Sequence, residues 1–296
     1  MPNRKAENVS PMEEIFQTLK RLMPELAPHL RRAARYILDR PHEVAMSSMR
    51  ALAGKAKVSP PTMLRLARRV GFDNYESFRA VFQGVVTGSN FRQKAVSLRK
   101  LGEHQGEAGV IRSMSDAAIE NIGRSFSNPE NGDIVRAAEM LRHAPTVYAF
   151  GVGAFHWMCS YLQYLSRAVL PQLRVPKANG NSLVEGLVGV KEGDVILIMS
   201  ASPYAMQTVK AAELSRGAGA SVIGITDSLG SPLAPHCDVL LIAGTESPQF
   251  YPSMVGIVAI IETLIALVVS KGDKDTLARI ATIDRLRRSE GGYFEL

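Results

Sequence analysis

The sequence has few cysteines, and neither of them occurs in a metal-binding pattern. Its 296 residues include only Cys159 and Cys237, and neither has a second cysteine at ligand spacing. This argues against a disulfide framework or a structural zinc site. His156 and His236 lie close to the two cysteines, but single pairs of this kind are more often packing contacts. We therefore expect no metal and no cofactor.

Long apolar runs are also absent. A bilayer-spanning helix needs about 20 predominantly apolar residues, and the longest candidate, residues 254–269, contains Glu262. The first residues lack the apolar core of a secretory signal. We expect a cytoplasmic protein that does not contact membranes. The length is sufficient for two domains, each with its own core.

Positive charge is concentrated in the first hundred residues. Residues 1–100 contain 19 Lys and Arg against 8 Asp and Glu, whereas residues 101–296 contain 16 against 20. A basic module joined to a mildly acidic one predicts that the first module binds a polyanion and the second does not.

The basic module has the pattern of a helix-turn-helix. Helices are predicted over 12–23 and 29–38, and the second of them ends before Pro41. Ser47 or Ser48 then caps a helix over 49–56, residues 57–58 form a turn, and Ser59 caps a helix over 60–70. Gly71 is the residue type expected just past a helix end. A closing helix over 71–82 directs Phe72, Tyr75, Phe78 and Phe82 into the core.

The second helix of this motif has one apolar and one polar face. Met63, Leu66, Ala67 and Val70 form the inward stripe, which leaves Ser59, Thr62, Arg65, Arg68 and Arg69 outward. In a major groove the start of such a helix would bring Ser59, Thr62 and Arg65 to base edges, while Lys57, Arg68 and Arg69 would contact phosphates. The alternative is a solvated basic face on a small bundle.

The composition changes after this module. Residues 90–109 are polar, with mixed charge and three glycines, which is typical of a linker, and helical spacing returns over 111–126. We assign residues 12–87 to the helix-turn-helix domain and 88–127 to a linker and bridging helix. Residues 128–270 then form the second domain, and 271–296 form a C-terminal helix and tail.

The second domain alternates strands and helices. Strands are predicted at 147–150, 173–175, 195–199, 220–226 and 239–242, which indicates a doubly wound parallel sheet. The run VILIM at 195–199 has no polar alternation, so we expect it to be covered on both faces. The fold class is therefore an all-α helix-turn-helix bundle followed by an α/β domain, a flavodoxin-type sandwich.

A ligand site is predicted where strand 195–199 gives way to a helix. Ser200 and Ser202 stand at this carboxyl edge, where open α/β sheets bind ligands and where a helix N-terminus favours an anion. Tyr204 follows these serines, Thr208 lies one helical turn beyond Tyr204, and we expect both to shape the pocket.

Two glycines at a neighbouring helix start belong to the same expected site. Gly151 and Gly153 permit close backbone approach. They do not form a dinucleotide fingerprint, because the third glycine position is His156. The candidate acids and bases are His156, Glu185, Asp227 and His236, and no pair among them has the spacing of a general acid and base. We expect no catalytic residue.

At this point the motifs resemble a known family. The run ALAGKAKVSPPTMLRLARRVGFDNYESF at 51–78 closely resembles the amino-terminal domain of bacterial MurR/RpiR-type transcriptional regulators. The second domain resembles the sugar isomerase (SIS) domain that they carry, on FGVG at 150–153, SAS at 200–202, GASVIGITD at 219–227 and SPLA at 231–234. The resemblance covers about residues 12–270.

The resemblance implies a dimer or tetramer that binds double-stranded operator DNA and senses a small effector, commonly a phosphosugar. The chain departs from the usual Ser-x-Ser-Gly-x-Thr loop, since it reads SASPYA at 200–205, and Phe155 replaces a serine often found after the glycine turn. These changes remove backbone freedom and up to two donors from an anion cradle. The effector is expected to be a phosphosugar or a related carbohydrate derivative.

Three functions compete on the sequence alone. The leading interpretation is a cytoplasmic transcriptional regulator, located at the nucleoid when bound to DNA. The alternative is an SIS-type aldose-ketose phosphosugar isomerase with Glu185 as its base. A third reading is an oligomeric sensor that acts on a protein partner, for which Arg65→Ala would leave function unchanged.

Overall fold

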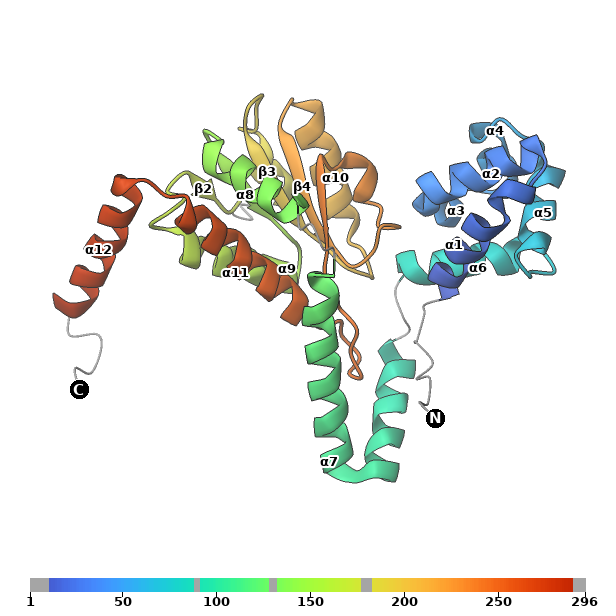
Figure 1. Cartoon of the computed structure of the whole chain (residues 1–296), viewed down its shortest axis with the longest axis horizontal. Coiled ribbons are helices and arrows are strands. Elements are labelled where there is room, and N and C mark those ends of the chain that lie inside the picture. Colours follow the sequence, from blue (N-terminus) through green and yellow to red (C-terminus); the bar gives the residue numbers. More distant parts are fainter. Residues whose placement is uncertain (1–10, 88–90, 128–131, 177–182, 290–296) are drawn as a thin grey trace. The chain divides into compact units, whose positions relative to one another are not determined.

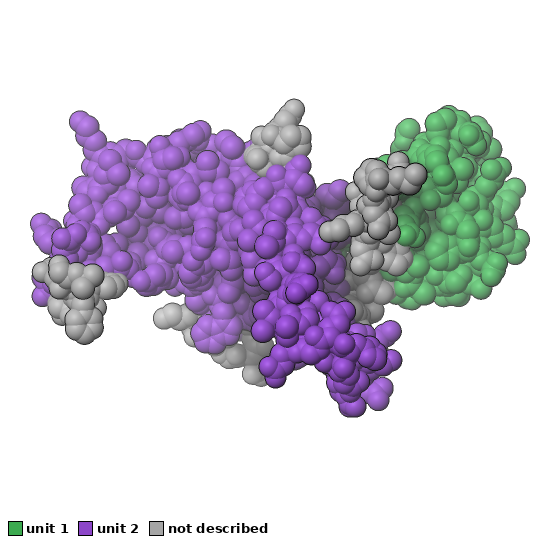
Figure 2. All heavy atoms as spheres, turned by 60° about the horizontal axis from the view of Figure 1, so that its bottom comes forward, with its two compact units in different colours: residues 1–89, 230–232 green, residues 90–229, 233–296 purple. Residues whose placement is uncertain are grey.

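The computed structural model describes residues 11–87, 91–127, 132–176 and 183–289, and the chain divides into two compact units (Figures 1 and 2). Unit 1 comprises residues 1–89 with 230–232. Unit 2 comprises residues 90–229 with 233–296. The expected start of the second domain, residue 128, lies outside the described residues.

Unit 1 is a bundle of helices (Figure 1). They are α1 (Pro11–Leu22), the 3-10 helix η1 (Met23–Glu25), α2 (Pro28–Asp39), α3 (Pro41–Met46), α4 (Met49–Lys55), α5 (Pro60–Arg69) and α6 (Tyr75–Thr87). Helix α3 was not expected. Pro41 begins it rather than a loop, because proline is tolerated in the first turn of a helix.

The core of unit 1 contains the predicted apolar faces. Met63, Leu66 and Ala67 of α5 are buried, and Val70 packs against the same cluster half-buried. The four aromatic residues assigned to the core all belong to it. The ring centroids of Phe78 and Phe82 lie 5.0 Å apart. These aromatics therefore fill the bundle and are not a stacking surface for bases.

Unit 2 contains a five-stranded parallel sheet of order β2-β1-β3-β4-β5. Its strands are β1 (Val147–Phe150), β2 (Leu173–Arg174), β3 (Val195–Met199), β4 (Ser221–Thr226) and β5 (Val239–Ile242). The helices and 3-10 helices are α7 (Phe91–Ser125), α8 (Gly132–His143), α9 (Ala154–Ser166), η2 (Leu183–Leu187), α10 (Met206–Gly217), η3 (Ala234–His236), α11 (Val255–Ser270) and α12 (Lys274–Ser289).

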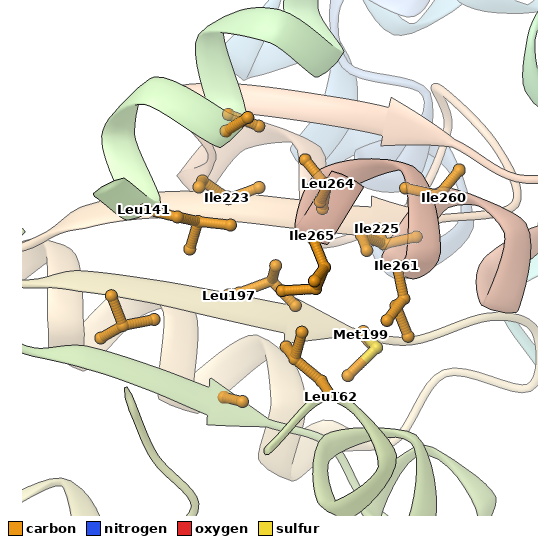
Figure 3. Packing of buried hydrophobic residues seen from close by; sticks show 14 of the residues in the cluster. Leu141, Leu162, Leu197, Met199, Ile223, Ile225, Ile260, Ile261, Leu264 and Ile265 are labelled. Carbon is orange, nitrogen blue, oxygen red and sulfur yellow. The ribbon is translucent and has the colours of Figure 1, made fainter. Parts of the chain in front are cut away.

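Strand β3 is covered on both faces, as its apolar run predicted. Val195, Leu197 and Met199 belong to the core formed with α8, α9 and α11, and Figure 3 shows Leu197 and Met199 beside residues of α11. Ile196 and Ile198 belong to a second core on the other face, with α10. All five strand residues are buried. The sheet is therefore the middle layer of three.

Helix α7 corrects the expectation of a linker over 90–109. It runs from Phe91 to Ser125 and is broken only at Gly106, whose φ of 65° and ψ of −174° are not helical. The mixed charge that suggested a linker instead supports an exposed helix, since Arg99 and Glu103 pair at 2.8 Å one turn apart. The predicted second part, 111–126, is helical as expected.

Among the described helices, no single one is long and apolar enough to cross a membrane. Helices α11 and α12 pass such a test only as a pair, and a bend of 118° separates them. The apolar side chains of α11 pack on the sheet (Figure 3).

The loop after β5 is attached to α7 by buried polar contacts. The Asn121 side chain donates to the Glu246 carbonyl at 2.7 Å and accepts from the Glu246 N–H at 2.9 Å. Ser125 Oγ accepts from the Gly244 N–H at 2.9 Å. Gly256, at the start of α11, lies in the same contact, because a Cβ there would be 2.5 Å from both Ser125 Oγ and the Gly244 carbonyl.

We therefore expect Gly256→Ala to destabilise unit 2 by roughly 1–3 kcal/mol, the usual cost of overpacking. The free energy of unfolding can be followed by the fluorescence of the only tryptophan, Trp157, which lies in unit 2. The matched control is Gly123→Ala in α7, where a Cβ meets nothing within 4 Å. The control should stabilise the helix by up to about 1 kcal/mol. Equal effects of the two changes would contradict this account of the contact.

Candidate functional site

The helix-turn-helix of unit 1 is built by local capping and packing. Ser48 Oγ accepts from the Ala51 N–H at 3.2 Å and caps α4. The turn that follows contains Lys57 at φ 52°, and the Val58 N–H donates to the Ala53 carbonyl at 2.9 Å. Ser59 is the N-cap residue of α5 by position, although its hydroxyl makes no cap bond to the backbone. The turn thus fixes where α5 begins.

Five of the six expected DNA-binding residues are exposed, namely Lys57, Ser59, Arg65, Arg68 and Arg69. Four of these residues carry a positive charge: Lys57, Arg65, Arg68 and Arg69. In the part of the chain that the structure describes, no carboxylate lies within 4.0 Å of their charged groups. Glu43 of the same unit pairs instead with Lys55 at 2.7 Å. The basic face is therefore open to an anionic partner.

Thr62 was expected on the outward face of α5, and this prediction was wrong. Its side chain is only 2% exposed, because the inward stripe of α5 is wider than the four apolar residues and includes this position. Thr62 Oγ1 lies 2.9 Å from Ser59 Oγ and accepts from the Arg65 guanidinium at 3.4 Å. Thr62 therefore orients Ser59 and Arg65 from beneath.

One contact to the turn could not be predicted from the sequence. The Arg32 guanidinium of α2 donates to the Lys57 carbonyl at 3.3 Å, across 25 residues of chain. Arg31 donates to the carbonyls of Met23, Pro24 and Leu26. These two arginines stabilise the bundle, so not all of the positive charge of unit 1 is available to a partner.

The second predicted site, at the carboxyl end of β3, is partly closed. Ser200 is 1% exposed and Thr208 is fully buried. Their hydroxyl oxygens lie 3.2 Å apart, and Thr208 Oγ1 also donates to the Ala205 carbonyl at 2.6 Å. The structure thus brings Ser200 and Thr208 together, but beneath the loop rather than on its surface.

Ser202 and Tyr204 are half-buried and converge on a residue that the site prediction omitted. The Ser202 N–H donates to Asp227 Oδ2 at 3.1 Å, and the Tyr204 hydroxyl donates to Asp227 Oδ1 at 2.6 Å. The Thr226 hydroxyl donates to the same Oδ1 at 3.2 Å. Parallel pairing of β3 and β4 could have placed Asp227 here from sequence, since Met199 is in register with Ile225. In the sequence Asp227 is a candidate acid or base and the last residue of the motif at 219–227, and neither pattern places it against Tyr204.

Gly151 and Gly153 have a structural explanation. A Cβ at Gly151 would lie 2.6 Å from the Phe155 Cβ, and Gly153 precedes α9 at φ 62°. Gly151 therefore allows a close approach to Phe155 of the same chain, whereas a Cβ at Gly153 would meet nothing within 4 Å and only its positive φ favours glycine. Phe155 itself is buried.

The remaining acid and base candidates do not assemble a catalytic group. Glu185 is exposed on η2, and no described side chain hydrogen-bonds its carboxylate. The described residues contain no group of three metal-ligating side chains. Burial raises the pKa of Cys159 to about 12, and burial with the nearby Asp238 carboxylate raises that of Cys237 to about 12. Both thiols are therefore poor nucleophiles at neutral pH.

The chain matches two family models that lie side by side along the sequence. Residues 14–86 match the helix-turn-helix domain of the rpiR family, and residues 140–270 match the SIS domain. The HTH-type transcriptional regulator HexR of Pseudomonas aeruginosa is 27% identical over 226 residues, which cover 75% of this chain and 76% of HexR. The bifunctional protein glk of Paraburkholderia xenovorans is 27% identical over 77% of this chain but only 35% of its own length.

Two solved structures share the fold. The sugar isomerase domain of an RpiR transcription factor from Sphaerobacter thermophilus has a TM-score of 0.55 at 24% identity, and covers 59% of this chain and 97% of its own. The Vibrio vulnificus NanR protein complexed with ManNAc-6P has a TM-score of 0.54 at 20% identity, over 93% of this chain and 98% of its own. The second likeness extends over both units.

The buried position of Thr62 gives a test of the recognition face. We expect Thr62→Val to lower the free energy of unfolding of unit 1 by about 1 kcal/mol, because Ser59 and Arg65 lose a shared partner. Far-UV circular dichroism reports the helices, and Trp157 fluorescence follows unit 2 separately. A changed preference among DNA sequences with no loss of stability would instead place Thr62 at the DNA surface.

Proposed function

Because the chain belongs to the RpiR family, with a helix-turn-helix domain followed by a SIS domain, we propose that it is a transcriptional regulator that binds operator DNA through α5 and responds to a small metabolite at the carboxyl edge of its sheet. Such a protein acts in the cytoplasm and lies at the nucleoid when bound to DNA.

The observation that carries this proposal is the exposed basic face of the turn and α5. Residues 1–89 contain 15 Lys and Arg against 8 Asp and Glu, and Lys57, Arg65, Arg68 and Arg69 all have their charged groups open to solvent. DNA phosphates attract such a face without regard to sequence. Arg65 and Ser59 lie toward the start of α5, the part of a recognition helix that reaches base edges. Lys57, Arg68 and Arg69 are assigned to phosphates.

The effector is proposed to be a phosphosugar or a related carbohydrate derivative. The fold likeness to NanR, which was solved with ManNAc-6P, supports a ligand of this class. In open parallel sheets the loops at the carboxyl ends of the strands form the ligand crevice. Ser202 and Tyr204 are the half-buried residues of that edge that we expect to contact it.

Helix α7 provides a route from the effector to the DNA-binding unit. Asp227 follows β4, and Gly244 follows the neighbouring strand β5, whose Ile242 is in register with Thr226. The loop after β5 is hydrogen-bonded to Asn121 of α7, and its Phe250 and Tyr251 lie 6.2 Å and 4.9 Å from the Phe91 ring at the other end of the helix. A ligand that shifts this loop would therefore shift the helix that leads along the chain to unit 1.

The exposed apolar stripe of α7 supports a homo-oligomer, a dimer or tetramer. Ile111 and Ile119 are 70% and 68% exposed, and Met114 and Ile122 lie on the same face of the helix. Monomeric proteins rarely leave such a stripe in water. Two DNA-binding heads also match the paired half-sites of a typical operator.

The DNA-binding proposal is tested with Arg65→Ala. We expect the Kd for duplex DNA from upstream of the protein's own gene to rise about 5- to 150-fold, because one contact to a base edge is worth about 1–3 kcal/mol. Fluorescence anisotropy at several salt concentrations gives the Kd and the salt slope. Lys57→Ala should instead weaken all sequences alike and reduce the salt slope by about 1.

The matched control for these arginine and lysine changes is Arg136→Ala, an exposed residue of α8 in unit 2. It should leave the Kd unchanged. If the Arg65 and Arg136 variants bind DNA with equal Kd, α5 does not contact the DNA. Failure of the unmodified protein to bind any upstream fragment specifically would reject the proposed function.

The oligomer is tested with Ile119→Glu, which places a charge in the middle of the apolar stripe. We expect the dimer dissociation constant, measured by sedimentation equilibrium, to rise at least tenfold, since burying an unpaired charge is costly. Val188→Glu is the control, because Val188 is also exposed, at 87%, but lies outside α7. A stripe that is not an interface would leave both variants with the unmodified association state.

A further inference from the structure

The edge of the sheet that we assign to the effector holds a carboxylate where an anion would have to bind. We propose that Asp227 determines specificity there: it excludes phosphate esters and selects a ligand that donates hydrogen bonds, through sugar hydroxyls or an ammonium group. This inference rests on the proposed function, because it concerns the effector of the same site. Of the two effector classes proposed there, it selects the carbohydrate derivative without a phosphate over the phosphosugar.

Three donors of the edge are directed at this one carboxylate. They are the Ser202 N–H at 3.1 Å, the Tyr204 hydroxyl at 2.6 Å and the Thr226 hydroxyl at 3.2 Å. A backbone N–H in the loop between a strand and a helix is the kind of donor that holds a bound phosphate. In this chain the Ser202 N–H already has an anionic partner from its own sheet.

Further donors of the same loop are missing or buried. Pro203 has no N–H to offer. The hydroxyl of Thr208 donates to the Ala205 carbonyl at 2.6 Å, and both Thr208 and its neighbour Ser200 are buried. A phosphate that used the Ser202 N–H and the Tyr204 hydroxyl would thus have to replace Asp227 as their acceptor.

The charge of the surrounding loops also opposes a phosphate. The described loops at the carboxyl ends of β1, β3, β4 and β5 are residues 151–153, 200–205, 227–233 and 243–254. They contain Asp227 and Glu246 and no Lys or Arg. A phosphate dianion would therefore meet the Asp227 carboxylate without a compensating cation from these four loops, and like charges at close range disfavour binding.

The Asp227 carboxylate suits a ligand that donates hydrogen bonds. A carboxylate offers about four acceptor positions, and the three donors named above leave capacity for one more. Asp227, Ser202 and Tyr204 are half-buried, so a ligand hydroxyl or ammonium would replace water at a site that is partly shielded. Charge-assisted hydrogen bonds of this kind are about twice as strong as neutral ones.

The test compares the unmodified protein with Asp227→Asn, which retains the size of the side chain and removes its charge. Inorganic phosphate and ManNAc-6P are the probes, and their Kd is measured by calorimetry and by the shift in melting temperature, since a ligand of the folded state raises it. We expect Asp227→Asn to bind both probes at least tenfold more tightly than the unmodified protein. Asp275→Asn, an exposed position in α12 with the same change in net charge, should bind them as the unmodified protein does.

Equal phosphate affinity in the Asp227 variant and the unmodified protein, including no binding by either, overturns the exclusion of phosphate.

A panel of unphosphorylated sugars and amino sugars tests the selection for hydrogen-bond donors. A compound that stabilises the unmodified protein should lose at least tenfold in affinity in Asp227→Asn. If only sugar phosphates, or no compound in the panel, raise the melting temperature of the unmodified protein, the proposed selection for hydrogen-bond donors is wrong. Because DNA affinity is measured on the same samples without any ligand, failure of the proposed function is seen separately.

Discussion

The structure of unit 2 depends on one constraint, which is that strand β3 must be covered on both faces. Its side chains alternate between two cores, with Leu197 directed to α11 and Ile198 to α10. A parallel strand buried in this way cannot turn directly into its neighbour, so each connection crosses a face of the sheet as a helix. All strands then end at the same edge. Ser202 and Asp227 are 25 residues apart in the chain, and they meet because of this topology.

The parts of the molecule that sequence reasoning predicted are those specified by local chemistry. The apolar run 195–199 indicates a buried strand without any knowledge of its neighbours. The serine, the two prolines and the glycine that bound α5 specify its beginning and end in the same local way. The helix-turn-helix and the parallel sheet were therefore available from residue types and their spacing alone.

Two of the three errors concern contacts that spacing does not determine. Thr62 is polar by residue type, and the packing of the bundle around α5, which residue spacing does not give, buries it. The segment 90–109 was predicted as a linker because it is polar, with mixed charge and three glycines, yet salt-bridged pairs such as Arg99 and Glu103 suit an exposed helix. The partnership of Tyr204 with Asp227 required the register of β3 and β4. The errors at Thr62 and Tyr204 thus concern tertiary environment, whereas the error over residues 90–109 concerns local helix preference.

The same topology limits how a ligand can act on DNA binding. A ligand shifts an equilibrium only by the difference in its affinity for two arrangements, and allosteric couplings are typically about 1–3 kcal/mol. The edge loops after β4 and β5 are adjacent, and the second is fastened to α7 by the buried Asn121. Two hydrogen bonds to a fully buried side chain make this attachment stiff, whereas Gly106 interrupts the helix further on. If the proposed function holds, the coupling between effector and DNA depends on the contact of Phe91 with Tyr251, because this contact joins the loop after β5 to the part of α7 before Gly106. The coupling requires that this contact persists with and without the effector.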